Sequence, residues 1–183
     1  LGRCYSHQFN SLEDSEERIQ ASTFTLLHLE QALNYFVQNQ GRDPATSART
    51  CQAIGTHHLD KEDYEKAVSY LEKAYKRFEP IKETHRKPYL ETCAYLSYAY
   101  FKQLQYEKAL PLLFKLTASW DSQKEEAELF NAYVGLSLCY CSLSVENSSL
   151  EEQEKASQAL ETAIRMYTSV ASQPPKFAKF LKG

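Results

Sequence analysis

Glycine and proline are scarce in this chain, and their scarcity limits the folds open to it more than any other feature. The 183 residues include 5 glycines and 6 prolines, about half of the usual share. Two glycines lie at the ends, so the interior holds Gly41, Gly55 and Gly135, far from one another. β-Sandwiches, barrels and hairpin meanders need more turn residues, and phosphate loops need clustered glycines. The sequence predicts an all-α fold and excludes most nucleotide-binding enzymes.

Apolar residues recur at the three-then-four spacing that gives a helix one buried face. The clearest run is Tyr64, Ala67, Val68, Leu71, Ala74, Tyr75 and Phe78. Prolines lie near the expected helix boundaries, and Ser122-x-x-Glu125 and Ser149-x-x-Glu152 have the pattern of capping boxes. We expect helices over residues 1–8, 15–38, 44–58, 61–78, 87–103, 106–119, 123–143 and 150–171, with a short amphipathic segment near 175–182 and no strand.

Two residue patterns alternate along the chain. The first is a leucine-like residue before a small one, with an aromatic or histidine three later, as in Leu1-Gly2…Tyr5, Ile54-Gly55…His58, Leu96-Ser97…Tyr100 and Leu136-Ser137…Tyr140. The second is an alanine with an aliphatic residue four later and a small or aliphatic one three beyond, as in Ala67…Leu71…Ala74, Ala109…Leu113…Leu116 and Ala156…Leu160…Ala163. The small residue lets a second helix approach closely, and we expect the alanine opposite it.

The alternation of these two patterns resembles the sequence repeat of the tetratricopeptide repeat (TPR) family. Twelve residues separate Gly55 from Ala67, and Ser97 from Ala109, as in that family. At the position where the TPR pattern has a tryptophan, this chain has Cys51, Cys93 and Tyr133. The small residues at 2, 55, 97 and 137 are also more widely spaced than the ~34 residues of the family. We expect the extra residues of the last unit to form a loop over 146–152. The resemblance implies helical hairpins that stack into a right-handed solenoid.

We expect one TPR-like domain over residues 1–183. Its units span about 1–40, 44–80, 87–120 and 123–171, and residues 172–183 form a capping tail. The alternative for this tail is a short helix on a membrane surface. Because the chain lacks an initiating methionine, we also expect it to be a fragment of a longer protein.

The sequence contains no pattern typical of a catalytic or metal site. No histidine pair has the helical spacing of a zinc site, and Cys51 and His58 lie two helical turns apart, too far for a nucleophile and its base. We therefore predict no enzyme activity, no cofactor and no small-molecule substrate. The net charge of −3 disfavours nucleic acid, and no apolar stretch reaches the ~20 residues of a membrane span. Five cysteines, three of them on apolar faces, favour reduced thiols in the cytoplasm or nucleus.

The TPR resemblance implies that the first helix of each pair lines a concave groove for a partner. Tyr95, Tyr98 and Phe101 form an aromatic cluster that Arg49 and Lys102 flank, as at interface hot spots. The alternative is that a neighbouring helix covers the cluster. The predicted contact residues are Arg49, Gln52, Thr56, Glu91, Tyr95, Tyr98, Phe101, Lys102, Asn131, Val134 and Leu138, with Ala53 on the same face. The carboxylate clamp of chaperone-binding TPR domains is absent, because Gln52, Thr56, Tyr95, Asn131 and Gly135 stand in its places.

These observations favour a non-catalytic scaffold for protein–protein interaction that binds a partner peptide or helix in the groove. One alternative is a structural segment of a larger repeat array, with self-association. The other is a regulatory domain fused to a catalytic domain outside this chain.

Overall fold

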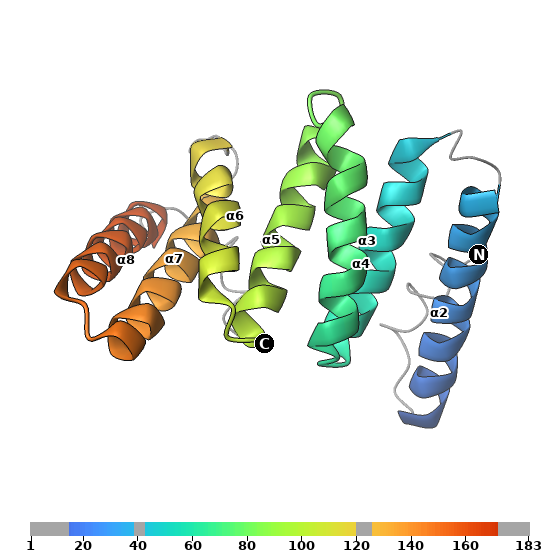
Figure 1. Ribbon diagram of the computed structural model, residues 1–183, viewed down its shortest axis with the longest axis horizontal. Coiled ribbons are helices and arrows are strands. Elements are labelled where there is room, and N and C mark those ends of the chain that lie inside the picture. Colours follow the sequence, from blue (N-terminus) through green and yellow to red (C-terminus); the bar gives the residue numbers. More distant parts are fainter. Residues whose placement is uncertain (1–14, 39–42, 120–125, 172–183) are drawn as a thin grey trace. The chain divides into compact units, whose positions relative to one another are not determined.

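The computed structural model describes residues 15–38, 43–119 and 126–171, and these ranges form seven α-helices and one short 3-10 helix, without a strand (Figure 1). The elements are α2 (Ser15–Gln38), α3 (Pro44–Asp60), α4 (Tyr64–Phe78), η1 (Glu79–Ile81), α5 (Arg86–Lys102), α6 (Tyr106–Ser119), α7 (Glu126–Asn147) and α8 (Leu150–Ala171). The all-α prediction is confirmed for this part of the chain, and three helices have the predicted bounds. The helix expected over 1–8 and the segment near 175–182 lie outside the described residues. The right-handed solenoid stays a prediction.

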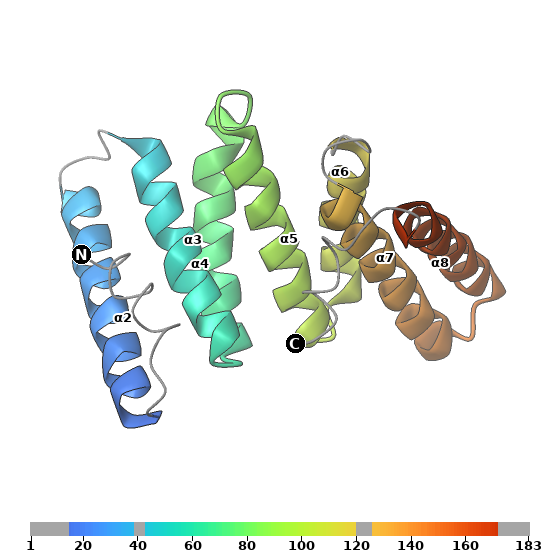
Figure 2. The same ribbon diagram turned by 180° about the vertical axis from the view of Figure 1, so that it is seen from behind.

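The helices divide into two compact units, residues 1–95 and 96–183, and the single domain that we expected stays a prediction. In the first unit, α3 and α4 lie side by side as a helical hairpin, and α2 lies along α3 (Figures 1 and 2). The hydroxyl of Ser22 on α2 lies 3.3 Å from Nε2 of His57 on α3. Asp43 caps α3, because its carboxylate accepts from the amide of Ala45 at 3.1 Å, and Pro44 takes the first helical position.

The contact between α3 and α4 is close because Gly55 has no side chain. A Cβ atom built there would lie 2.6 Å from Cγ of Leu71. The small residue therefore permits the close approach that we predicted, although the nearest atoms belong to Leu71 rather than to Ala67. Ile54, Leu71 and Phe78 are fully buried around this contact.

The second unit holds the rest of α5 and the helices α6, α7 and α8. Helices α6 and α7 approach closely at Gly135, where a Cβ atom would lie 2.9 Å from Cδ2 of Leu113. Helices α7 and α8 form a hairpin (Figures 1 and 2). Their core consists of small and aliphatic residues, among them Leu136, Cys139, Ala156 and Ala163.

Three helical hairpins close with the same turn. Each turn contains one residue with positive φ, and in each the amide of the next residue donates to a carbonyl five residues earlier, as in a Schellman motif. These residues are Glu62 (φ 58°), Leu104 (φ 60°) and Ser148 (φ 53°). The hydrogen bonds are Asp63 to His58 (2.9 Å), Gln105 to Tyr100 (2.9 Å) and Ser149 to Ser144 (3.2 Å). The common turn is an independent sign that the chain repeats one hairpin.

The loop that we expected over 146–152 is wrong. Helix α7 continues to Asn147 and α8 begins at Leu150. Seven residues separate Gly55 from Glu62, and Ser97 from Leu104, but eleven separate Ser137 from Ser148. The four additional residues lengthen α7, and three more lengthen α8 before Ala156. Each addition is about one helical turn, so the extra residues extend the two helices and need no loop.

Candidate functional site

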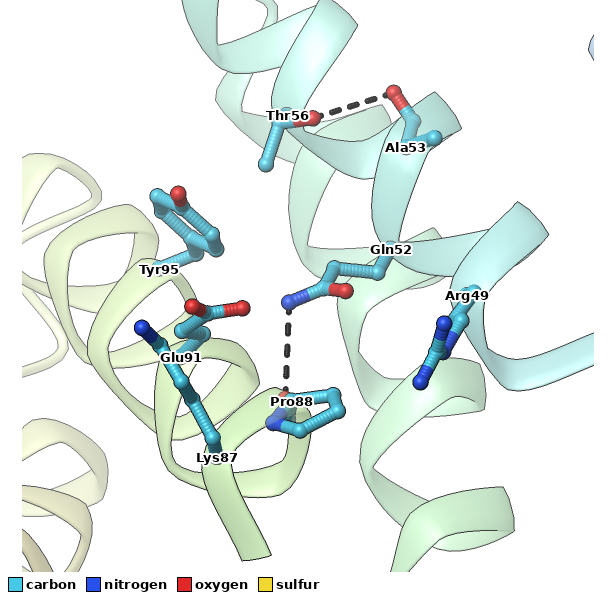
Figure 3. A pocket seen from close by; sticks show the side chains of 8 residues that line it. All are labelled: Arg49, Gln52, Ala53, Thr56, Lys87, Pro88, Glu91 and Tyr95. Carbon is cyan, nitrogen blue, oxygen red and sulfur yellow. Dashed lines mark hydrogen bonds between the residues drawn. The ribbon is translucent and has the colours of Figure 1, made fainter. Parts of the chain in front are cut away.

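A pocket of about 450 Å³ lies between α3 and the first half of α5, within the first unit (Figure 3). Four residues of each helix line it: Arg49, Gln52, Ala53 and Thr56 from α3, and Lys87, Pro88, Glu91 and Tyr95 from α5. Most of these side chains are polar or charged, and Ala53 and Pro88 are apolar.

The residues of α3 that line the pocket lie on one face of this helix, and residues on its other faces are buried. Arg49, Gln52, Ala53 and Thr56 follow at three, four and seven residues, which places them in one row. Cys51, Ile54 and His58, on other faces, are buried. The Thr56 hydroxyl donates to the carbonyl of Ala53 at 3.1 Å, so it is held against its own helix (Figure 3).

The α5 wall is held where this helix begins. The Tyr89 hydroxyl donates to Oε2 of Glu79 at 2.7 Å, and its ring stacks on Tyr75 with centroids 5.6 Å apart. The carbonyl of Pro88 accepts from the Thr92 hydroxyl at 2.8 Å and from Nε2 of Gln52 at 3.4 Å. Gln52 thus reaches from α3 to α5, as Figure 3 shows.

The pocket contains two cations and one anion. Arg49 and Lys87 are positively charged at neutral pH, and Glu91 is negatively charged. Burial raises the pKa of the Tyr95 hydroxyl, and the charges of Glu91 and Asp60 raise it further. Tyr95 therefore keeps its proton at neutral pH and can donate a hydrogen bond. The pocket offers positive charge on both of its helices, but its lining presents no nucleophile with an adjacent base.

The pocket brings together five of the predicted contact residues: Arg49, Gln52, Thr56, Glu91 and Tyr95. The other six lie in the second unit. On α5, Tyr98 is exposed with Lys102 Nζ 5.5 Å from its ring centre, and Phe101 packs against Tyr106 with ring centroids 5.6 Å apart. On α7, Asn131 and Leu138 are exposed and Val134 is half-buried. That all eleven predicted contact residues bind one partner stays a prediction.

Lys87 and Pro88 are not among the predicted contact residues, and we interpreted the prolines only as marks of helix boundaries. The spacing contained the signal, because Lys87 and Pro88 precede Glu91 by four and three residues. Extending the predicted row by one turn toward the start of α5 would have included both.

The described residues contain no group of three or more His, Cys, Asp or Glu side chains that could hold a metal ion. His58 packs between α3 and α4: it is buried, stacks on Tyr70 at 5.8 Å and has Nδ1 3.5 Å from the Asp63 carboxylate. Cys51, Cys93 and Cys139 are buried free thiols, and burial raises the pKa of Cys139 to about 11. Among the helices that the structure describes, none is long and apolar enough to cross a membrane.

We predict that acid destabilises the fold, because the neighbouring histidines His57 and His58 of α3 lie in a partly buried environment. Burial lowers the pKa of His57 and of His58, although the Asp63 carboxylate partly opposes this for His58. As the pH falls below about 6.5, the unfolded chain binds protons that the folded chain does not. The free energy of unfolding should therefore be highest above that pH and fall toward the lower pKa values of the folded state. Urea unfolding between pH 7.5 and 5.5 measures this.

The matched control for this pH dependence is the double variant His57→Gln, His58→Gln. It should show a shallower fall of the free energy of unfolding over the same pH range. An unchanged slope would assign the acid sensitivity to other groups.

The family of this chain follows from comparison with known proteins. The family model described as "Meiosis protein SPO22/ZIP4 like" matches residues 42–182, which include α3 to α8 and every residue of the pocket. Comparisons with curated proteins and with solved structures gave no match. Since the matched range is well over half of the sequence, the chain belongs to the SPO22/ZIP4-like family of meiosis proteins.

Proposed function

We propose that this chain is a non-catalytic scaffold of meiosis that binds a segment of a partner protein in the pocket between α3 and α5. The observation that carries the proposal is the pocket itself. Eight side chains from two helices converge on about 450 Å³, within the range of ligand sites, and Gln52 joins the two walls. Membership of a meiosis family supports the biological setting, and it favours the nucleus among the two predicted compartments.

The chemistry of the lining indicates what kind of segment fits. Arg49 and Lys87 each offer positive charge to an Asp or Glu side chain, because a carboxylate accepts from a guanidinium or an ammonium group. Ala53, Pro88 and the ring of Tyr95 offer apolar contact to a neighbouring side chain. We therefore propose a partner segment with an acidic residue beside an apolar one. An extended peptide and one face of a helix can both present that pair.

Charge reversal in the pocket tests the proposal. The purified chain selects binders from a displayed peptide library, and the dissociation constant of a selected peptide is then measured for each variant. Arg49→Glu and Lys87→Glu should each weaken binding at least about tenfold, since each replaces a favourable charge by a repulsive one.

Lys76→Glu is the matched control, because Lys76 is an exposed lysine of α4 outside the pocket. It should leave the affinity within about twofold. Circular dichroism shows whether each variant is folded. Equal affinity for wild type and both pocket variants would contradict the proposal, as would an equal loss in Lys76→Glu.

The contact residues outside the pocket stay separate proposals. The same peptide can be measured against Tyr98→Ala and Lys102→Glu on α5, and against Asn131→Ala, Val134→Ala and Leu138→Ala on α7. Weaker binding adds the substituted residue to the contact surface, and unchanged binding removes it.

A further inference from the structure

The charges beside the pocket follow the same order on both of its helices. On α3, Arg49 comes about three turns before Asp60, the last residue of the helix. On α5, Lys87 comes about one turn before Glu91. Each helix therefore has its cation nearer its beginning and its carboxylate nearer its end.

The two helices run in the same direction along the pocket, because two interactions between them keep nearly the same offset. Gln52 donates to the carbonyl of Pro88, 36 residues later. In addition to burial, the charges of Glu91 and Asp60 raise the pKa of Tyr95, and Tyr95 comes 35 residues after Asp60. In an antiparallel pair, Asp60 would instead lie beside a residue that precedes Pro88. The cations and the carboxylates of the two helices are therefore ordered in the same sense.

The pocket thus has a positive end and a negative end. In Figure 3, Arg49 and Pro88 lie toward one end, and Thr56 and Tyr95 lie at the other. The ring of Tyr95 is 40% exposed, and α3 ends beside it at Asp60. A helix end of this kind carries partial negative charge, and an exposed aromatic face attracts cations. Together with the two carboxylates, these features favour an ammonium or guanidinium group at the negative end.

The charges of the lining are available to a partner. Arg49, Lys87 and Glu91 form no ion pair with another residue in the part of the chain that the structure describes. Along the helices, Lys87 and Glu91 are about 6 Å apart, and Arg49 and Asp60 about 17 Å apart. An extended segment covers such distances with about two to five residues.

We propose that the bound segment carries a basic residue about two to five positions from its acidic one, and this inference rests on the proposed function. The acidic residue lies toward the beginning of α3 and α5, and the basic residue lies against Tyr95, Glu91 and Asp60. Asp60 then determines specificity, although it does not line the pocket. A segment with acidic residues alone is disfavoured, because the two carboxylates repel it.

Selection from a displayed library of random peptides tests this order of charge. Peptides selected by the wild-type chain should contain Lys or Arg at the stated spacing from Asp or Glu more often than the unselected library. Asp60→Lys and Glu91→Lys each reverse one charge at the negative end. Peptides selected by either variant should keep the acidic residue and lose the enrichment in Lys and Arg, because the basic residue then meets a like charge.

Exchange of charges measures the same contact as an affinity. Replacing the basic residue of a selected peptide by Glu should weaken its binding to the wild-type chain about tenfold. Glu91→Lys should restore most of that loss, because the two charges are opposite again. Glu65→Lys is the matched control, since Glu65 is an exposed glutamate of α4 outside the pocket, and it should restore none. Circular dichroism identifies a variant that fails to fold, and Asp60→Lys then decides in place of Glu91→Lys.

The results distinguish this inference from the proposed function. If Arg49→Glu weakens the binding of a selected peptide while Asp60→Lys and Glu91→Lys do not, the inference is overturned and the proposed function stands. Selected peptides rich in Asp and Glu but not in Lys and Arg have the same meaning. Unchanged affinity in all three variants would contradict both. Equal restoration by Glu65→Lys would assign the effect to net charge and overturn the inference.

Discussion

Gly55→Ala should lower the free energy of unfolding by about 1–3 kcal/mol, the usual cost of forcing extra volume into a packed contact. Propensity alone gives the opposite sign, since alanine is favoured over glycine inside a helix by about 1 kcal/mol. Urea unfolding followed by circular dichroism at 222 nm measures the difference. The sign of the result therefore separates packing from helix propensity.

Packing should win because Leu71 has no room to move. The added Cβ would lie 2.6 Å from Leu71 Cγ, 2.9 Å from its Cδ2 and 3.3 Å from its backbone nitrogen. The first distance involves the branch point of the side chain rather than its end, and Leu71 is fully buried. Relief requires a shift of α3 against α4, in a region where Ile54 and Phe78 are also fully buried.

Two variants check this explanation of the Gly55→Ala result. In Gly135→Ala the nearest atom is Cδ2 of Leu113 at 2.9 Å, the end of a flexible side chain, and the next is at 3.4 Å. A small rotation relieves that contact, so the net change should lie within about 1 kcal/mol of zero. Adding Leu71→Ala to Gly55→Ala should cost less than the sum of the two single changes, because each makes room for the other. Equal losses for the two glycines, or strict additivity, would contradict the packing argument.

The sequence was informative wherever burial determines the structure. The row from Tyr64 to Phe78 predicted α4 because its apolar residues repeat with the helical period, and Ala67, Leu71, Ala74 and Phe78 are indeed buried. His58 takes the aromatic or histidine place of the first residue pattern, and its ring stacks on Tyr70. Gly55 marked a close helix contact for the same reason. For each of these residues, the residue type and its spacing in the sequence indicate burial or close packing.

The closing turns were not predictable in the same way. Glu62, Leu104 and Ser148 adopt positive φ, although glycine is the usual residue there. Their conformation follows from the hydrogen bonds and packing of the whole hairpin. Without a glycine to mark the turn between α7 and α8, the polar stretch over 146–152 resembled a loop. Its additional residues instead add one turn to each helix.

The candidate site was predicted in part, for a related reason. Rows of exposed residues on α3 and α5 could be read from helical spacing, which gave Arg49, Gln52 and Thr56 on one helix and Glu91 and Tyr95 on the other. The pairing of these rows depends on how α5 begins, with Tyr89 on Tyr75 and Glu79. That contact is tertiary. It positions Pro88 to accept from Gln52, and no pattern in the sequence indicates it.

Phe78→Ala should be the most destabilising single substitution considered for this chain, with a loss of about 3–5 kcal/mol in the free energy of unfolding. Phe78 is the largest of the fully buried side chains in the described part of the chain and ends α4. Its removal forfeits the apolar area and leaves a cavity, because the helix backbone around it cannot collapse into the space. The loss is measured from the urea midpoint and slope.

Phe114→Ala makes the same chemical change at an exposed position and is the matched control. Phe114 is 49% exposed, and its main aromatic contact is an edge-on pair with Tyr140 at 6.3 Å. Its loss should be about 1 kcal/mol, since a half-exposed ring buries little area and such a pair contributes about 0.5–1.5 kcal/mol beyond it. A difference of several kcal/mol between these two variants assigns the stability to burial at the end of α4. Similar losses at both positions would contradict this assignment, because a half-exposed ring would then stabilise the fold as much as one in the core.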